Sequence, residues 1–233
     1  MDTQTRHSLK QDRLVEATRT SVGWFQDHRS RVIQAAIVAA VLMGLVIAAL
    51  VFYNQRSAAA DLAFGEAMDT YSTPLAQPGQ PPVPGEKTFP TAAARAKLAN
   101  QQFVQIAGKY SLLGAGKTAR YFAGLTSVDL GQTGQAETYL KQVADGHDAA
   151  LASLAKLALA NLYQQLNRNS EAVVLYNELI AKPTNTVPAD AARLQLAALY
   201  ETTNPSEAKK IYAQLKGSKS SAGQIATQKL QQK

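Results

Sequence analysis

Residues 170–176 read SEAVVLY, and similar segments lie 36 residues before and after, GQAETYL at 134–140 and SEAKKIY at 206–212. Each segment has an alanine in the same register, a leucine or tyrosine one turn later and an aliphatic residue after that. Apolar side chains spaced three and four residues apart indicate an amphipathic helix. The constant spacing predicts one structural unit built three times. The register positions are Ala136, Leu140 and Val143; Ala172, Tyr176 and Leu179; Ala208, Tyr212 and Leu215.

A second small residue precedes each of these alanines and predicts a partner helix. Gly124 and Ala160 lie twelve residues before the first two alanines, and Ala197 takes this place in the third unit, where the turn is one residue shorter. Small residues are needed where two helices cross closely, because a larger side chain would push the backbones apart. An earlier partial unit has the same register, with Ala99, Phe103 and Ile106.

This pattern resembles the tetratricopeptide repeat, a helix–turn–helix unit of about 34 residues. Tyr163 and Tyr200 lie where that repeat commonly has a tyrosine, whereas its usual tryptophan is absent and Pro183 comes one residue early. A generic antiparallel helical hairpin would explain part of the pattern, but three units in constant register favour the repeat. One unit cannot bury its apolar face alone, so the resemblance implies an α-solenoid over 91–233, capped by a helix at 222–230.

Helix-forming residues, mainly Ala, Leu, Gln and Lys, dominate the chain outside one proline-rich stretch. Six prolines and two glycines between 72 and 90 predict a loop. The segment Asn204-Pro205-Ser206-Glu207 has the residue order of a helix start. Helices are expected over 57–71, 91–109, 117–130, 134–143, 150–165, 170–181, 189–202, 205–215 and 222–230.

The resemblance also implies a binding groove, because the first helix of each tetratricopeptide unit lines the concave side. The side chains expected there are apolar or amide with few charges, which suits an extended or helical peptide. The alternative is that some of them are ordinary packing residues. The predicted partner-binding groove consists of Tyr121, Leu125, Val128, Leu157, Asn161, Gln164, Gln165, Leu194, Ala198 and Glu201.

The N-terminal part contains the run VIQAAIVAAVLMGLVIAALVF from Val32 to Phe52, with no charge and Gln34 as its one polar side chain. At ~1.5 Å per residue, a helix of this length spans roughly 30 Å, the hydrocarbon thickness of a bilayer. We therefore predict one transmembrane helix over 32–53 that contacts the lipid bilayer. A cleaved signal peptide is the rival interpretation, but its apolar core is usually only ~7–15 residues long.

The charges on either side of this run predict its orientation. Lys and Arg are retained on the cytoplasmic side during insertion. The tail at 1–31 is therefore expected in the cytoplasm, with 54–90 (a membrane-proximal helix and the proline-rich loop) and the repeat domain at 91–233 exported. The flanking charges are Arg6, Lys10, Arg13, Arg19, Arg29 and Arg31 before the run, and Arg56, Asp61, Glu66 and Asp69 after it.

The composition gives little sign of catalytic chemistry. The chain has no cysteine, which excludes disulfides and thiolate sites, and its three histidines, His7, His28 and His147, lack partners at metal-ligand spacing. The net charge of +7 is spread along the chain, with no basic run dense enough to indicate nucleic-acid binding. We predict no catalytic residue, cofactor, metal or small-molecule substrate.

One segment, Gly114-Ala-Gly116-Lys117-Thr118, is similar to a phosphate-binding loop. The first glycine of that motif would lie five residues before Gly116, where this chain has Ser111, and no strand precedes the segment. We therefore interpret it as a turn between helices, with the next helix starting at Lys117.

The layout of a short tail, one anchor and exported repeats resembles the YfgM-like ancillary subunit of the Sec translocon, including the stretch from Val15 to Ala67. That resemblance implies a bacterial inner-membrane protein with a periplasmic domain. It also implies association with the SecYEG channel, a membrane-anchored periplasmic chaperone or exported polypeptides. The proline-rich insertion at 72–90 departs from the family and splits the first unit. The expected function is a non-catalytic adaptor; alternatives are a scaffold for outer-membrane biogenesis, secretion or division, and a regulatory subunit of a membrane enzyme.

Overall fold

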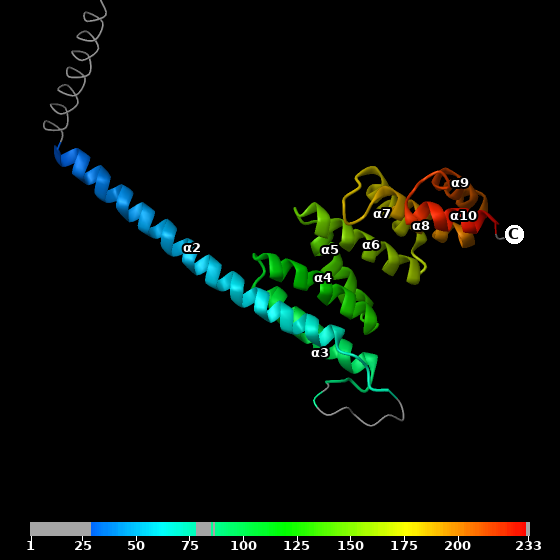
Figure 1. The fold of residues 1–233 in the computed structure, drawn as a ribbon, viewed down its shortest axis with the longest axis horizontal. Coiled ribbons are helices and arrows are strands. Elements are labelled where there is room, and N and C mark those ends of the chain that lie inside the picture. The colour runs from blue at the N-terminus through cyan, green and yellow to red at the C-terminus, as the bar shows by residue number, and fades with distance from the viewer. Residues whose placement is uncertain (1–28, 78–84, 86, 232–233) are drawn as a thin grey trace, which may run out of the picture. The chain divides into compact units, whose positions relative to one another are not determined.

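The structure is a computed structural model that describes residues 29–77, 85 and 87–231. Most of the predicted cytoplasmic tail and the middle of the proline-rich loop lie outside these residues. The described chain is all-α, apart from one isolated β-bridge (Figure 1). The helices are α2 (Arg29–Ser72), α3 (Ala92–Lys109), α4 (Gly114–Asp129), α5 (Thr133–Ala144), α6 (Ala149–Gln165), α7 (Asn169–Ala181), α8 (Ala189–Thr203), α9 (Pro205–Leu215) and α10 (Ser221–Gln231).

The first described helix, α2, is long and apolar enough to cross a membrane. Large side chains along its apolar run are exposed, and Ile37 and Leu42, for example, are each 57% exposed. Exposing so much apolar surface to water would be strongly unfavourable, at about 25 cal/mol per Å². These features indicate a membrane anchor. The chain divides into two compact units between Arg56 and Ser57, so the last turns of α2 belong to the second unit.

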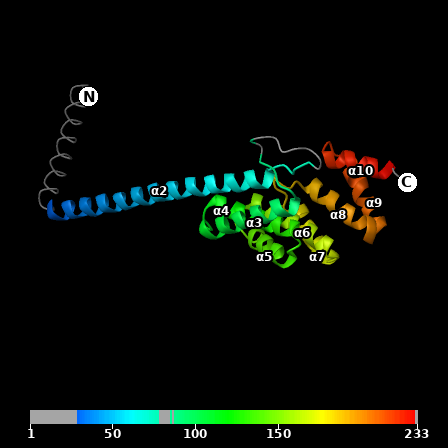
Figure 2. The ribbon, with the colours of Figure 1, turned by 90° about the horizontal axis from the view of Figure 1, so that it is seen from below.

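In the second unit, each helix packs against the next one along the chain, and the pairs α4–α5, α6–α7 and α8–α9 follow each other as antiparallel hairpins (Figures 1 and 2). The last helix, α10, packs on α9 and α8 and covers the end of the stack. The predicted helical stack after an apolar N-terminal helix is therefore confirmed.

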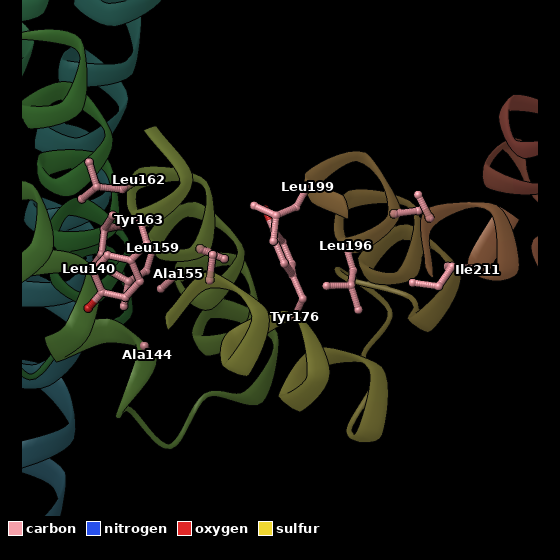
Figure 3. Packing of buried hydrophobic residues seen from close by; sticks show 14 of the residues in the cluster. Leu140, Ala144, Ala155, Leu159, Leu162, Tyr163, Tyr176, Leu196, Leu199 and Ile211 are labelled. Carbon is pink, nitrogen blue, oxygen red and sulfur yellow. The ribbon is translucent and has the colours of Figure 1, made fainter. Parts of the chain in front are cut away.

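The side chains at the repeated register positions of the sequence form the core of this stack. All twelve register side chains, from Ala99, Phe103 and Ile106 in α3 to Ala208, Tyr212 and Leu215 in α9, are at most 6% exposed. Figure 3 shows Leu140 beside Leu159 and Tyr163, and Tyr176 beside Leu199. The apolar side chains of one hairpin thus pack on those of the next, which explains why a single hairpin would be unstable.

Close helix crossing explains the small residue that precedes each register alanine. A Cβ atom added to Gly124 would lie 2.8 Å from Cγ and Cδ2 of Leu140, which is completely buried. Ala160 and Ala197 are also completely buried at the corresponding crossings. A larger side chain at any of these positions would force α4, α6 or α8 away from its partner helix.

The turns inside the first two of these hairpins, α4–α5 and α6–α7, repeat the 36-residue spacing. Gly131 (φ +69°) and Asn167 (φ +59°) both have left-handed backbone conformations. In each turn the next residue donates its N–H to a carbonyl five residues back, Gln132 to Ser127 at 2.8 Å and Arg168 to Tyr163 at 2.8 Å. This Schellman-type ending favours glycine or asparagine.

The proline-rich insertion leaves the first hairpin intact. Its two ends are joined by hydrogen bonds between Ala76 N and Phe89 O (2.8 Å) and between Phe89 N and Pro74 O (3.0 Å). Beyond it, Arg95 Nη1 donates to Thr73 O at 3.0 Å. The last turns of α2 therefore pack antiparallel to α3 and complete the unit that the insertion splits in sequence.

The segment similar to a phosphate loop is helical, so its interpretation as a turn with a helix starting at Lys117 is wrong. α4 begins at Gly114, and Lys117 N already donates to Leu113 O at 3.1 Å. A Cβ atom on Gly116 would overlap the carbonyl group of Tyr110 at the end of α3. Gly116 is glycine because two helix ends meet there.

Candidate partner-binding groove

An open cleft of about 280 Å³ lies between α4 and α6, beside the last turn of α2. Most of its walls are aliphatic or aromatic, and polar groups from Asp129, Asn161 and Gln165 interrupt them. The lining residues are Tyr71, Tyr121, Leu125, Val128, Asp129, Leu154, Leu157, Ala158, Asn161, Leu162 and Gln165.

The structure brings six of the ten predicted groove residues together in this cleft. They are Tyr121, Leu125, Val128, Leu157, Asn161 and Gln165. Tyr71 was missed because the insertion at 72–90 hides the register of the first unit. Aligning buried Ala67 with Gly124 would have placed Tyr71 in the position that Val128 occupies four residues after Gly124.

Stacked aromatic rings hold one wall of the cleft in place. Phe103 and Phe122 stack with ring centroids 5.2 Å apart, and the Tyr71 ring lies edge-on to both, at 6.1 and 6.0 Å. Tyr121 lies edge-on to Phe122 at 5.4 Å. Such pairs add about 0.5–1.5 kcal/mol each beyond the area they bury. The two tyrosine rings at the cleft are thus fixed before any ligand arrives.

The hydroxyl groups of these two tyrosines stay neutral in this environment. Burial, followed by the charge of Asp129, raises the pKa of Tyr71, whose hydroxyl donates to Asp129 Oδ2 at 3.4 Å. Burial also raises the pKa of Tyr121. Asp129 is the one carboxylate among the residues that line the cleft, so most of its surface offers apolar contact and neutral hydrogen-bonding groups.

The hydroxyl groups of two buried tyrosines, Tyr176 and Tyr212, donate hydrogen bonds to some of the polar side chains that were predicted to line the groove. Tyr176 OH donates to Asn161 Oδ1 at 2.7 Å and lies 3.4 Å from Gln164 Oε1, and burial raises the pKa of Tyr176 to about 12. In the next unit, Tyr212 OH donates to Glu201 Oε1 at 2.8 Å. A buried hydroxyl without a partner is costly, so Asn161, with Gln164 nearby, accepts from Tyr176, and Glu201 accepts from Tyr212.

Where the inner residue is Leu140 or Phe103 and has no hydroxyl, the position equivalent to Gln164 is aliphatic or aromatic. Val128 takes the place of Gln164 in the unit of Leu140, and Tyr71 takes it in the unit of Phe103. The groove is therefore most apolar beside α2 and α4 and more polar towards α8. The predicted residues Leu194 and Ala198 lie on α8, half-buried and exposed respectively, and do not line the cleft.

A charged cluster joins the two hairpins that form the cleft. Arg168, between α6 and α7, bonds Glu137 of α5 (2.7 Å) and Glu171 (2.6 Å), and its guanidinium lies 4.1 Å from the centroid of the Tyr163 ring. Hydrogen bonds from Arg168, and then from Lys141, lower the pKa of Glu137 to about 2. Sequence reasoning missed this cluster, because Arg168 and its partner Glu137 are 31 residues apart. It links α5 to the turn between α6 and α7, and so connects the two hairpins whose helices α4 and α6 form the cleft.

The cleft is lined by apolar and aromatic side chains, two amides and one carboxylate. Among the described residues, no group of three or more His, Cys, Asp or Glu side chains is placed to hold a metal ion. No family model, curated protein or solved structure matches this chain. The geometry of the cleft is therefore the basis for proposing a function.

Proposed function

We propose that this protein is a membrane-anchored adaptor that binds other proteins through the cleft between α4 and α6. The observation that supports this most is the pre-formed cleft with fixed tyrosine rings, aliphatic walls and amide groups. Such a surface fits a short apolar segment, helical or extended, whose polar groups reach Asn161 and Gln165. The proposed role is non-catalytic, and the stacked hairpins act as a tetratricopeptide-like scaffold.

The proposed location is a bacterial inner membrane, with the N-terminal tail in the cytoplasm and the hairpin stack in the periplasm. The excess of Lys and Arg before the apolar run supports this orientation. By resemblance of layout, the proposed partners are subunits of the Sec translocon, a periplasmic chaperone or the emerging polypeptides. An anchored groove would raise the local concentration of such partners beside the channel.

Affinity capture after in-cell crosslinking tests this proposal with a matched pair of variants. Leu125→Lys puts a charge into the cleft at a half-buried residue, whereas Val174→Lys makes the same kind of change on an exposed residue of α7. Recovery of partners should fall at least about fivefold for Leu125→Lys, equivalent to ~1 kcal/mol, and stay unchanged for Val174→Lys.

The identity of the captured proteins separates the alternatives. Translocon subunits and periplasmic chaperones would support the adaptor at the export channel. Factors of outer-membrane biogenesis, secretion or division, captured through the same cleft, would instead support the envelope-assembly scaffold. Equal recovery by both variants would contradict the use of this cleft.

A further inference from the structure

We propose that the α3–α4 turn, residues 109–117, docks on the anionic surface of the bilayer that α2 enters, with Leu112 inserted among the lipid head groups. This inference depends on α2 being a membrane anchor and not on what the cleft binds.

The position of the turn follows from the register between α3 and the last turns of α2. Arg95 bonds Thr73, and the rings of Phe103 and Phe64 lie 5.9 Å apart, so the two segments run antiparallel side by side (Figures 1 and 2). Tyr110 lies seven residues after Phe103, and Ser57 lies seven residues before Phe64. Since both segments rise ~1.5 Å per residue, the turn reaches the level of Ser57.

The chain keeps this end of the stack close to the membrane. Ser57 follows Phe52, the last residue of the apolar run, by five residues. Five residues span about 7.5 Å as a helix and at most about 18 Å when fully extended. The head-group layer is itself roughly 5–7 Å thick on each side of the hydrocarbon core. Since α2 is helical throughout this segment, Ser57 lies only about 7.5 Å beyond Phe52 along the helix, at the outer edge of the head-group layer.

The turn presents an apolar tip to its surroundings. Leu112 is 87% exposed, more than any other large apolar side chain among the described residues, including those of the apolar run. Its neighbour Leu113 is buried, which fixes the direction of the turn. A leucine this exposed in water stabilises nothing in the folded chain, whereas at a bilayer interface its burial would be favourable.

The charge around this tip is of one sign. Residues 91–128 contain five Lys or Arg and no Asp or Glu, and Lys109 and Lys117 flank Leu112 as exposed side chains. The nearest acidic residue of α2 beyond Ser57 is Asp61, one turn further along the helix. The next turn at the same end of the stack, between α5 and α6, carries Asp145 and Asp148. The basic character is thus confined to the hairpin beside the anchor, as expected for attraction to anionic lipid.

Spin labelling of the full chain in vesicles tests this docking, because the natural sequence has no cysteine. Gly114→Cys places a label beside Leu112, at an exposed position where a Cβ atom would meet nothing within 4 Å. Gln132→Cys places the control label in the α4–α5 turn, at the opposite end of α4. The accessibility of each label is then measured separately to two relaxing agents, oxygen, which partitions into lipid, and a water-soluble nickel chelate.

We expect the label at Gly114→Cys to favour oxygen over the chelate in vesicles of phosphatidylcholine containing about one third phosphatidylglycerol. The label at Gln132→Cys should favour the chelate. Adding Leu112→Asn, or Lys109→Gln with Lys117→Gln, should return the Gly114→Cys label to the control value. Omitting phosphatidylglycerol should do the same.

Two results would overturn the docking. One is a Gly114→Cys label as accessible to the chelate as the control in anionic vesicles. The other is a label that becomes protected only when a partner protein is added, which would make the turn a protein contact. Protection that persists without phosphatidylglycerol and without the lysines would contradict the role of anionic lipid. None of these results depends on partner capture through the cleft.

Discussion

Gly116→Ala should destabilise the hairpin stack strongly, although alanine favours helices and the position lies inside the first turn of α4. The new Cβ atom would lie roughly 1 Å inside the closest approach of 3.0 Å that such atoms keep, and it would meet the backbone carbonyl of Tyr110. A backbone atom cannot rotate away as a side chain can, so α4 must move off the end of α3.

The structure allows an estimate of the cost of that movement. It disturbs the packing of Ala119 and Ala123, both completely buried, which costs about 1–3 kcal/mol. It also strains the bond from Leu113 N to Tyr110 O (2.9 Å), worth about 0.5–1.5 kcal/mol. The higher helix propensity of alanine offsets up to about 1 kcal/mol of this cost. These terms give a net loss between about 0.5 and 4.5 kcal/mol, centred on about 2–3 kcal/mol.

The matched control is Gly114→Ala, two residues earlier in the same helix, where a Cβ atom would meet nothing within 4 Å. Urea unfolding of the full chain in detergent micelles, followed by far-UV circular dichroism, measures both variants, because the membrane helix keeps its signal in the micelle. The control should be unchanged or more stable by up to about 1 kcal/mol. Equal stability of the two variants would refute the argument that helix packing requires glycine at 116.

Three further predictions concern stability. Asn100→Ala should cost about 1–3 kcal/mol in the same assay, because it removes the amide donor that bonds the buried hydroxyl groups of Thr126 and Ser127 in α4, and an unchanged midpoint would contradict that role. The folded-state pKa of Glu137 is lowered from 4.5 to about 2, so its contribution is complete above pH 4.5 and disappears as the pH falls towards 2. The stability difference between the natural chain and Glu137→Gln should shrink over that range, and a constant difference would argue against the pairing with Arg168. At Asn167, with φ +59°, Asn167→Val should cost about 1–2 kcal/mol while Asn167→Gly stays within about 0.5 kcal/mol, and the reverse order in thermal unfolding would contradict the left-handed turn.

The sequence predicted the core of the stack well because packing between repeated hairpins is periodic. Ala172 and Tyr176 are buried for the same reason as their counterparts 36 residues away, so spacing alone located them. The prediction from the sequence was wrong at Gly114 and Gly116, where a glycine-rich segment was interpreted as a turn. The reason for Gly116 is a carbonyl of the preceding helix, which no local pattern reveals.

The groove was predicted in part, for a related reason. Helical spacing indicates which face of α6 a side chain lies on, so Leu157 and Asn161 were placed correctly in the cleft. Spacing does not indicate which polar side chains already accept a hydrogen bond from a neighbouring hydroxyl, as Asn161 does from Tyr176 and Glu201 does from Tyr212. The orientation in the membrane, the partners and the link to the translocon stay predictions.

The most direct test of the central claim is site-specific photocrosslinking in living cells. A benzophenone side chain at Leu125, in the cleft, is compared with one at Val174, on the exposed face of α7. We expect discrete crosslinked proteins at Leu125 that are absent at Val174 and that disappear when Tyr121→Lys is added. No crosslink at Leu125 above the level at Val174 would contradict the claim that the cleft between α4 and α6 binds protein partners.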